Sequence, residues 1–455
     1  MRKQKGLFIV GICIWIYSMV VTANASIQKD QERIAVEAVF PDENFRMAVS
    51  RQADQNKDGF LSETEIADLT ELVVDHPYQQ GNQNENYPFH DYDGIRMDVS
   101  GIEIFRNLKT LSFQNVEPVG WSIGKLMRLE TFCIDTAPEM ELDFSGASGL
   151  KKIKIMNMEL KNLNVNHSGV TEIDIYDTEF TRPFHGFAGA DHLRTAWICD
   201  TNLEEVDFTS NTKMEWIVIE RCDLKKIRLA GLKNLKHLSV RDTELKDIDV
   251  SDHKKLKMLS LERNQFTKID VSRNDKLESL YISGNPFTKI DSTTVKVSDM
   301  VPLGLLHAHD LNKCAVLDVS HIQSLQRVYA YSGRFRKVKI GKNLIRMDMV
   351  SNKGMTVLDK KTFHAPDGAK LKMLECNKGK LTVLDISHLT KLVYLDAGEN
   401  RLKKADLSGN LKLGTCILDG NRLEKLVVNS KSTRSQKKMY QTVIKHTGGK
   451  MVYKG

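Results

Sequence analysis

The chain has 455 residues, of which 27% are charged and 41% are hydrophobic, and its formal net charge is +7 at pH 7. This composition is typical of a folded protein and excludes an intrinsically disordered chain. The sequence has no phosphate-binding loop, no zinc-ligand spacing and no basic–aromatic pattern of the kind that binds nucleic acid, so a nucleic-acid partner is not expected.

Residues 1–25 have the pattern of a secretory signal peptide. Arg2, Lys3 and Lys5 precede an apolar run, and Ala23 and Ala25 supply small residues at the cleavage positions. The apolar run is too short for a transmembrane helix, and no second apolar stretch of spanning length follows. We therefore expect a secreted, extracellular protein whose mature chain has no transmembrane segment and no covalent anchor.

Residues 26–94 are predicted to form a small helical cap at the N-terminus. Phe45, Ala48 and Val49 recur at helical spacing. A segment with the spacing of an EF-hand calcium loop follows, and Gly59 allows its sharp turn. The predicted calcium ligands are oxygen atoms of Asp54, Asn56, Asp58, Phe60, Ser62 and Glu65. Since a single loop is visible, we expect a structural calcium ion that holds the cap on the next unit; the alternative is a turn that binds no metal.

A degenerate first repeat strand is predicted at Leu69, Leu72 and Val74. A polar insertion of about twenty residues interrupts it and is predicted to be a surface loop. His76 and His90 lie in this insertion, but no ligand-pair spacing indicates a metal site there.

Residues 95–428 carry an internal repeat. Residues 256–270 have the spacing L-x-x-L-x-L-x-x-N-x-L, and residues 277–291 repeat it 21 residues later. Such a repeat predicts a solenoid in which each coil adds one strand to a parallel sheet on the concave side. A short coil leaves no room for a full helix, so turns and short extended segments are expected on the convex side. The predicted strand starts are Leu108, Leu129, Leu150, Val170, Leu193, Met214, Leu235, Leu256, Leu277, Met300, Leu325, Leu344, Leu371, Leu392 and Leu413, with the least regular spacing between Met300 and Leu371.

An asparagine follows many of the predicted strands. Its side-chain amide can satisfy the backbone of the turn that leaves the strand. The positions concerned are Asn264, Asn285, Asn352, Asn400 and Asn421.

Residues 429–455 are predicted to be a C-terminal cap with a short amphipathic helix, a stop at Gly448 and Gly449, and a last strand. This segment contains seven lysine and arginine residues and no acidic residue. The favoured interpretation is a solvated cap; the alternative is a weak contact of this basic tail with an anionic cell surface.

Six cysteines follow the signal peptide, at positions 133, 199, 222, 314, 376 and 416. The predicted register puts Cys376 and Cys416 two coils apart, on the order of 10 Å, which is beyond disulfide reach. We therefore expect free thiols, with Cys133 and Cys199 exposed. Free thiols in an exported protein suit an anaerobic source.

The repeats resemble those of internalin-like bacterial surface proteins with 21-residue repeats. The D-V-S step of that subtype occurs at residues 98–100, 249–251 and 318–320, and Cys376 takes a leucine position as in that subtype. The segment FPDENFR with its EF-hand-like loop resembles secreted repeat proteins of Gram-positive anaerobes. The resemblance implies an α/β solenoid, the leucine-rich repeat horseshoe with a parallel concave sheet, and recognition of an extracellular protein or glycan.

Side chains between the leucine positions are predicted to face the concave side. Trp197 and Trp216 would lie on neighbouring strands there, and exposed aromatic residues aligned on one face favour ligand binding. The predicted ligand-binding residues are Glu172, Asp174, Tyr176, Trp197, Asp200, Trp216, Arg221, Tyr281, Tyr329, Tyr331 and Tyr394. The alternative is that these bulky residues only cover the sheet. Aromatic residues with an acidic rim suit a glycan or a basic protein segment.

No nucleophile–base set is apparent, so a non-enzymatic recognition protein is the favoured function. Cys133 and Cys199 have no histidine at a matching position of an adjacent strand. Carboxylates near Trp197 leave open a secreted carbohydrate-active enzyme on a solenoid scaffold.

Overall fold

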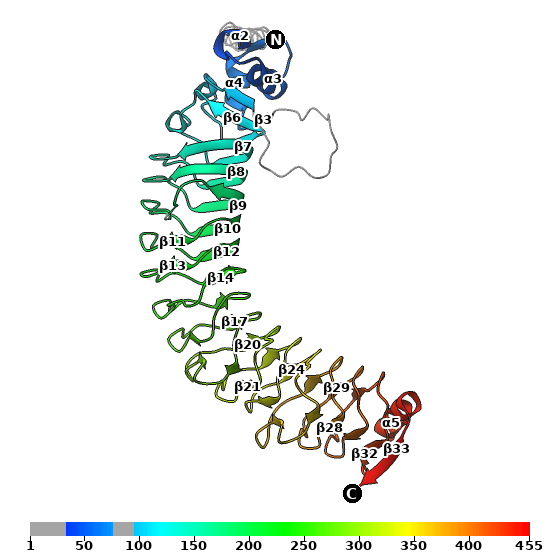
Figure 1. Ribbon diagram of the computed structural model, residues 1–455. Coiled ribbons are helices and arrows are strands. Elements are labelled where there is room, and N and C mark those ends of the chain that lie inside the picture. Colours follow the sequence, from blue (N-terminus) through cyan, green and yellow to red (C-terminus); the bar gives the residue numbers. More distant parts are fainter. Residues whose placement is uncertain (1–32, 76–94, 185) are drawn as a thin grey trace, which may run out of the picture. The chain divides into compact units, whose positions relative to one another are not determined.

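The structure is a computed structural model that describes residues 33–75, 95–184 and 186–455. These residues form two compact units: unit 1 extends to Pro183 and includes Phe187–Leu193, and unit 2 comprises Phe184–Gly186 and Arg194–Gly455. The signal peptide predicted at residues 1–25 and the polar insertion predicted at residues 76–94 lie outside the described residues. In each unit, successive turns of the chain add short parallel strands to a sheet, so the predicted leucine-rich repeat solenoid is confirmed (Figure 1).

Unit 1 begins with a small cap. Its elements are β1 (Ile34–Ala35), α2 (Val36–Val39), α3 (Glu43–Gln52), β2 (Phe60–Leu61) and α4 (Glu63–Asp68). Helix α3 begins after Asp42, whose carboxylate accepts hydrogen bonds from the backbone N–H groups of Asn44 and Phe45. The amide of Gln52 then hydrogen-bonds both polar backbone groups of Val73, at 2.6 and 3.0 Å. The cap thereby satisfies a backbone edge of β3 that would otherwise be unpaired.

The sheet of unit 1 contains the first degenerate strand, as predicted. Its strands pair in parallel in the order β3 (Glu71–Asp75), β5 (Thr110–Gln114), β7 (Thr131–Asp143), β8 (Lys152–Asn164) and β9 (Glu172–Phe180). A second parallel pair, β4 (Ile95–Asp98) with β6 (Val116–Val119), and the short 3-10 helices η1 (Ile102–Ile104) and η2 (Ile123–Lys125) complete this unit. Leu72, Leu111, Phe132 and Ile153 are register partners and are fully buried, so the leucine positions form the core.

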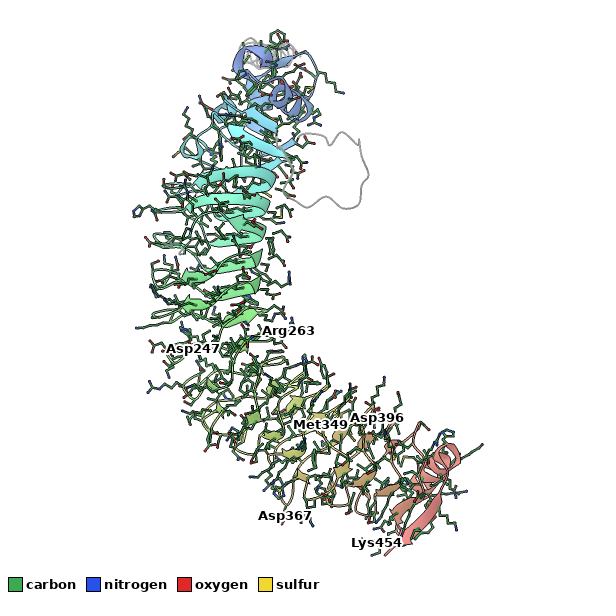
Figure 2. All side chains as sticks on the ribbon, viewed as in Figure 1. Asp247, Arg263, Met349, Asp367, Asp396 and Lys454 are labelled. Atoms are coloured by element: carbon green, nitrogen blue, oxygen red, sulfur yellow. The ribbon has the colours of Figure 1, made fainter. Side chains whose placement is uncertain are left out.

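Unit 2 contains one long parallel sheet, here called the main sheet (Figure 1). Its strands pair in the order β10 (Thr195–Thr201), β12 (Trp216–Cys222), β14 (His237–Arg241), β15 (Met258–Ser260), β17 (Ser279–Tyr281), β20 (Leu305–His307), β22 (Arg327–Tyr329), β24 (Arg346–Asp348), β27 (Met373–Glu375), β29 (Tyr394–Asp396) and β31 (Thr415–Ile417). The side chains on the main sheet that point away from the core form what we call the main-sheet face. Figure 2 shows Arg263 on this side of the unit and Asp247 on the opposite side.

The other side of unit 2 is built from short strands and turns, as the short repeat predicts. Its paired groups are β11 (Glu205–Asp207) with β13 (Lys226–Arg228); β16 (Ile269–Asp270) with β19 (Val295–Lys296); β18 (Lys289–Ile290), β21 (Val316–Asp318), β23 (Lys337–Lys339) and β26 (Phe363–His364); and β25 (Val357–Leu358), β28 (Val383–Asp385), β30 (Lys404–Asp406), β32 (Lys425–Asn429) and β33 (Lys450–Lys454). Among the described residues of unit 2, the only α-helix is α5 (Arg434–Thr447).

The predicted strand start at Met300 is wrong. The side chain of Met300 is 78% exposed, whereas Leu303 and Leu306 are fully buried and occupy the first two leucine positions of this coil. The coil is longer than its neighbours because β19 pairs with β16 before the chain returns to the main sheet. The main-sheet strand of this coil therefore starts three residues later than predicted.

The asparagines after the strands have the predicted role. The side-chain amide of Asn285 donates to the backbone carbonyl of Leu261 at 2.7 Å, and its oxygen accepts from the N–H of Phe266 at 2.9 Å. Asn264, Asn400 and Asn421 make equivalent bonds to a neighbouring coil, and Asn352 donates to Phe335. These bonds satisfy backbone groups that the tight turns would leave buried without partners.

The C-terminal cap consists of α5 and β33, which confirms the predicted order of helix and strand. Thr433 and Gln436 form a capping box at the start of α5. The side chain of Gln436 also donates to the backbone carbonyls of Leu411 and Leu413, at 3.0 and 2.9 Å. The helix ends at Gly448, which has a positive φ of 77°, a conformation that glycine adopts without strain.

All six cysteines in the described chain are free thiols, as predicted, but only Cys133 is partly exposed. The prediction that Cys199 is exposed is wrong, because this residue is 5% exposed. Burial and the neighbouring Glu220 raise the pKa of Cys199 to about 12. None of the helices in the described ranges is long and apolar enough to cross a membrane.

Candidate functional site

The predicted site residues of unit 1 lie on β9. Glu172 and Tyr176 are half-buried, whereas Asp174 is 6% exposed. The ammonium group of Lys152 pairs with both Glu172 and Asp174, the latter at 2.9 Å. Burial raises the pKa of Asp174 despite this pairing. Asp174 is therefore part of the packed sheet rather than an available carboxylate.

The two tryptophans at the start of unit 2 lie on the same face. In the register of β10 and β12, Thr195 pairs with Trp216 and Trp197 pairs with Val218, so both indoles belong to the main-sheet face. Trp216 is 36% exposed and stacks on the imidazole of His237, with ring centroids 4.0 Å apart. Trp197 is half-buried.

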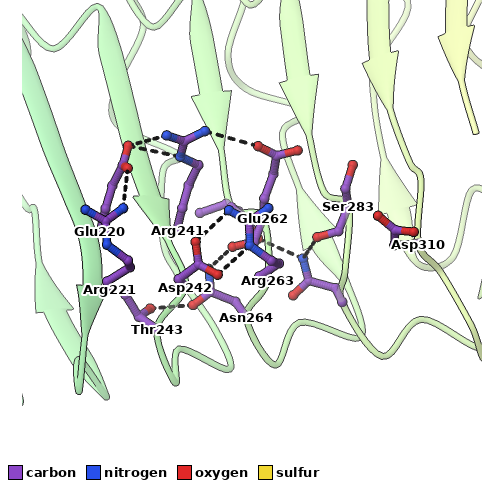
Figure 3. Close-up of polar contacts among 12 residues, drawn as sticks. Glu220, Arg221, Arg241, Asp242, Thr243, Glu262, Arg263, Asn264, Ser283 and Asp310 are labelled. Carbon is purple, nitrogen blue, oxygen red and sulfur yellow. Dashed lines mark hydrogen bonds and ion pairs between the residues drawn. The ribbon is translucent and has the colours of Figure 1, made fainter. Parts of the chain in front are cut away.

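Ion pairs run along one margin of this face. The guanidinium of Arg221 binds Asp200 through two hydrogen bonds of 2.5 Å. Arg263 binds Asp242 in the same two-pronged way, as Figure 3 shows. These four residues occupy equivalent positions in successive coils and have positive φ values of 51–55°. Each side chain therefore lies beside that of the next coil. Asp200 and Arg221, both predicted to bind a ligand, are therefore engaged with each other.

A second row of charges, here called the charge ladder, lies beside this margin. It consists of Glu220, Arg241, Glu262 and His309. Arg241 binds Glu220, with Nε–Oε1 at 3.0 Å, and also approaches Glu262 at 3.5 Å (Figure 3). The imidazole Nε2 of His309 lies 3.6 Å from Glu262 Oε1. Glu220, Arg241 and Glu262 thus alternate in sign on successive coils, and a protonated His309 continues the alternation beyond the uncharged Ser283, which favours pairing over repulsion.

Stacked rings continue along the middle of the main-sheet face. Tyr281, His307 and Tyr329 stack in sequence, with centroid distances of 4.5 and 4.8 Å. The guanidinium carbon of Arg346 lies 5.4 Å from the centre of the Tyr329 ring, within the range of a cation–π contact. The ring file, as we call it, consists of these three rings and of the neighbouring stacked pair His309 and Tyr331.

The neighbouring pair is His309 and Tyr331, which stack at 4.2 Å with an interplanar angle of 9°. His307, His309 and Arg346 were missed by sequence reasoning. The two histidines were hidden by the wrong strand start at Met300. Counted from Leu303, His307 falls at the position of its register partner Tyr281, and His309 falls two residues later, at the position of Ser283. Arg346 could have been found, because its strand start was predicted correctly.

The stacking decides what the ring file presents to a partner. The Tyr281–His307 and His307–Tyr329 planes are inclined by 23° and 28°, so the inner ring faces cover one another. The file therefore offers mainly ring edges, with tyrosine hydroxyl and imidazole nitrogen atoms, rather than a broad apolar ring face.

Tyr394 lies further along the face, beside carboxylates that carry like charges. Asp348, Glu375 and Asp396 are register partners on three successive strands. Burial and the charges of Asp348 and Asp396 raise the pKa of Glu375, although Arg346 binds it at 2.7 Å. Like charges directly opposite one another are unfavourable in a sheet, so this stretch differs from the alternating charge ladder.

The predicted calcium loop has an ordered set of hydrogen bonds. The carboxylate of Asp54 accepts from the backbone N–H groups of Asp58 and Gly59, at 3.2 and 3.0 Å, and Asn56 accepts from Asp58 at 2.9 Å. Gly59 has a positive φ of 80°, as the predicted sharp turn requires. These bonds fold the loop around the side-chain oxygens of its first half.

Glu65, the last predicted calcium ligand, closes the loop. Its carboxylate accepts from the N–H groups of Gln55 and Ser62, at 3.0 and 2.9 Å. Arg33 lies 2.6 Å from Asp58. Within the described ranges, no group of three or more His, Cys, Asp or Glu side chains is close enough to hold a metal ion. The donor set is nevertheless oxygen-only and includes an amide, a backbone carbonyl and a hydroxyl, which are ligands that Ca²⁺ accepts.

Comparisons with known proteins find the same architecture at low sequence identity. No protein-family model matches the sequence, and no curated protein matches it. A leucine-rich repeat protein of Leptospira interrogans has a TM-score of 0.53 at 15% identity, over 86% of this chain and 97% of that chain. The Toll–Spätzle complex of Drosophila has a TM-score of 0.51 at 14% identity, over 73% of this chain and 53% of that chain. The functional domain of InlJ from Listeria monocytogenes, which includes a cysteine ladder, has a TM-score of 0.48 at 20% identity, over 88% of this chain and 82% of that chain. At these identities the likeness to the first two, whose TM-scores are 0.53 and 0.51, establishes the fold alone.

Proposed function

We propose that the main-sheet face of unit 2, from β10 to β29, is the recognition surface of an exported protein and binds an extracellular protein ligand. The observation that carries this proposal is the ring file: five partly exposed tyrosine and histidine rings on three neighbouring strands, continued by Arg346. Tyrosine and arginine contribute disproportionately to protein interfaces, because they add large contact areas and hydrogen bonds at a small entropic cost.

A protein ligand fits this surface better than a glycan. Sugars stack on exposed aromatic ring faces, but most faces within the ring file are covered by neighbouring rings, with centroids 4.2–4.8 Å apart. The exposed ring edges and the charge ladder provide spaced hydrogen-bonding groups, which suit peptide groups and charged side chains. Trp216, whose ring has one face on His237 and is 36% exposed, is the main place where a sugar ring could stack.

The fold of the solved neighbours agrees with this proposal. The main sheet is of the leucine-rich repeat kind, and one neighbour with this fold, Toll, is part of a complex named for two proteins. Open solenoid sheets present an extended surface that suits another macromolecule. The function we propose is therefore recognition without turnover.

We also propose that the loop at residues 54–65 binds a structural calcium ion. Asp54, Asn56, Asp58, the Phe60 carbonyl, Ser62 and Glu65 would supply the oxygens. The support is the loop conformation: Gly59 makes the turn, and backbone N–H groups hold the oxygens of Asp54 and Asn56 on its inner side. An ion would neutralise carboxylates that otherwise have Arg33 as a cation partner, and would stabilise the cap that covers the edge of β3.

The recognition proposal is tested with the chain lacking the predicted signal peptide, displayed against panels of extracellular proteins and of polysaccharides. We expect saturable binding to a protein that is weakened at least tenfold by Trp216→Ala or Tyr329→Ala. Tyr453→Ala is the matched control, since Tyr453 is 49% exposed but lies on β33 in another sheet.

Two results would contradict the proposal. One is a ligand whose affinity is unchanged by both main-sheet substitutions. The other is the release of reducing ends from a polysaccharide, which would support the alternative of a carbohydrate-active enzyme.

A further inference from the structure

Two histidines lie two residues apart on the main-sheet face, one at the end of β20 and one just after it, in contrasting surroundings. His307 is enclosed between two tyrosine rings, Tyr281 and Tyr329. His309 lies against one tyrosine ring and between two carboxylates, those of Glu262 and Asp310. The same residue type therefore has different chemistry at neighbouring positions of one surface.

The contacts of His309 involve both ring nitrogens. Nδ1 lies 2.8 Å from Asp310 Oδ2, and Nε2 lies 3.6 Å from Glu262 Oε1. The His309 side chain is 12% exposed and the Glu262 side chain is 9% exposed. Glu262 lies just after β15, and His309 lies just after β20, two strands away. The two side chains meet across the small residue Ser283, whose hydroxyl accepts a hydrogen bond from the His309 backbone N–H.

The charges that face this cluster come from each neighbouring strand. On β14, Arg241 approaches Glu262 at 3.5 Å but binds Glu220 more closely, through Nε at 3.0 Å. On the other side, Tyr331 stacks on His309, and its own pKa is raised by burial and by the charges of Asp310, Glu262 and Asp348.

The immediate charge balance therefore depends on one proton. Glu262 and Asp310 supply two negative charges, and His309 supplies a positive charge when both of its ring nitrogens are protonated. An imidazolium can donate to both carboxylates at once, whereas a neutral imidazole donates to one of them only. His307 does not bridge the carboxylates, but its ring faces that of His309 edge-on, with centroids 6.2 Å apart, and a charge on His309 lowers the pKa of His307.

We propose that His309 controls the charge of this part of the recognition surface with pH, and that its deprotonation removes the positive charge between Glu262 and Asp310 and leaves one of these carboxylates free to bind a cationic side chain of the protein ligand. The regulation of ligand binding rests on the function proposed above; the titration of His309 does not. In acid, the imidazolium occupies the position between the carboxylates. In mild alkali, a lysine or arginine of the ligand takes over the role of the imidazolium.

The direction of the titration follows from the same contacts. Burial by itself lowers the pKa of His309, but hydrogen bonds and charges from Glu262 and Asp310 outweigh it and raise the pKa above the ordinary value of 6.5. Burial lowers the pKa of His307 below this value. Because the folded-state pKa of His309 is raised, its stabilising contribution is complete below pH 6.5 and is lost as the pH rises through the folded-state pKa.

The first experiment needs no ligand. The imidazole signals of the mature chain are followed by NMR from pH 5 to pH 9 and assigned with His309→Gln and His307→Gln. We expect an apparent pKa above 6.5 for His309 and below 6.5 for His307. Glu262→Gln should lower the pKa of His309, which Glu262 contacts, more than that of His307, which the Glu262 charge raises without contact. A His309 pKa at or below 6.5, or one that does not respond to Glu262→Gln, would overturn the proposal.

The second experiment measures competition by a cation. A hexa-arginine peptide is titrated into the wild-type chain at pH 5.5 and pH 8.0 at constant ionic strength. We expect binding to be roughly fivefold tighter at pH 8.0, which corresponds to ~1 kcal/mol. His309→Gln should bind equally at both pH values, at about the wild-type affinity of pH 8.0, whereas His307→Gln should keep the wild-type pH dependence.

The two experiments separate the claims. A shifted His309 pKa with peptide binding that is independent of pH would overturn the proposed control of binding, while leaving the recognition function open. If the natural ligand binds elsewhere but hexa-arginine competes with the His309 proton as described, the recognition function fails and the charge switch stands.

Discussion

Replacing Asn285 by alanine should destabilise the coils beneath the ring file by about 2–6 kcal/mol. Asn285 is 3% exposed and its side chain makes four hydrogen bonds. Its amide donates to Leu261, and its oxygen accepts from the N–H of Phe266; both of these residues are fully buried. A methyl group leaves the Leu261 carbonyl and the Phe266 N–H without this partner, and each unsatisfied buried group costs ~1–3 kcal/mol.

The remaining two bonds of Asn285 go to the carbonyls of Ile282 and Ser283. Loss of the bond to the fully buried Ile282, at 3.0 Å, moves the cost toward the upper end of this range, whereas loss of the bond to Ser283 adds little. The carbonyl of Ser283 accepts from Asn285 at 3.3 Å but also accepts from the backbone N–H of Arg263 at 2.8 Å, so it keeps a partner. Asn343→Ala is the matched control, because its amide makes one exposed hydrogen bond, to Gln323 at 2.9 Å. The control substitution should cost about 1 kcal/mol or less.

The assay must resolve local stability, because a long repeat array need not unfold in a single step. Hydrogen exchange of the amides in β15, β17 and β20, together with urea unfolding, would show whether the loss is confined to these coils. If Asn285→Ala and Asn343→Ala exchange and unfold alike, the hydrogen-bond argument is refuted, and the asparagine is not what holds the turn.

Calcium removal by a chelator should lower the melting temperature of the wild-type chain, because a bound ion at 100 times its dissociation constant contributes ~2.7 kcal/mol to the free energy of unfolding. The double variant Asp54→Asn, Asp58→Asn should not respond to the chelator. An equal response in both chains would exclude this loop as the calcium site. Iodoacetamide at pH 8 should modify Cys133 well before Cys199 in the native chain, since Cys133 is half-exposed and burial raises the pKa of Cys199 to about 12. Mass spectrometry of the tryptic peptides checks this order, and equal alkylation of the two thiols would show that Cys199 is more accessible than its packing implies.

Much of the fold could be predicted because its determinants are local. The leucine spacing places one buried residue after another on the same edge of every coil, and an asparagine such as Asn264 can reach the turn that follows its own strand. The capping residues are equally local: Asp42 serves the first turn of α3, and Gly448 supplies the positive φ that ends α5. Each of these features depends on residues a few positions apart.

The candidate site was predicted less completely. The alignment of Trp197 and Trp216 on one face follows from equal coil lengths, so counting residues was sufficient. Counting failed at Met300, because a longer coil inserts β19 before the main-sheet strand. That error moved His307 and His309 away from their true neighbours.

The sequence by itself determined the solenoid, its buried leucine positions and its two capped ends, because these arise from short-range periodicity and from the chemistry of individual turns. Only the tertiary structure decided which polar side chains meet. Glu262 and His309 lie in different coils and touch across a third, over Ser283. In a solenoid, the neighbours of a side chain come from the coils before and after its own. A register error in a single coil therefore changes every predicted contact that this coil makes with the two coils beside it.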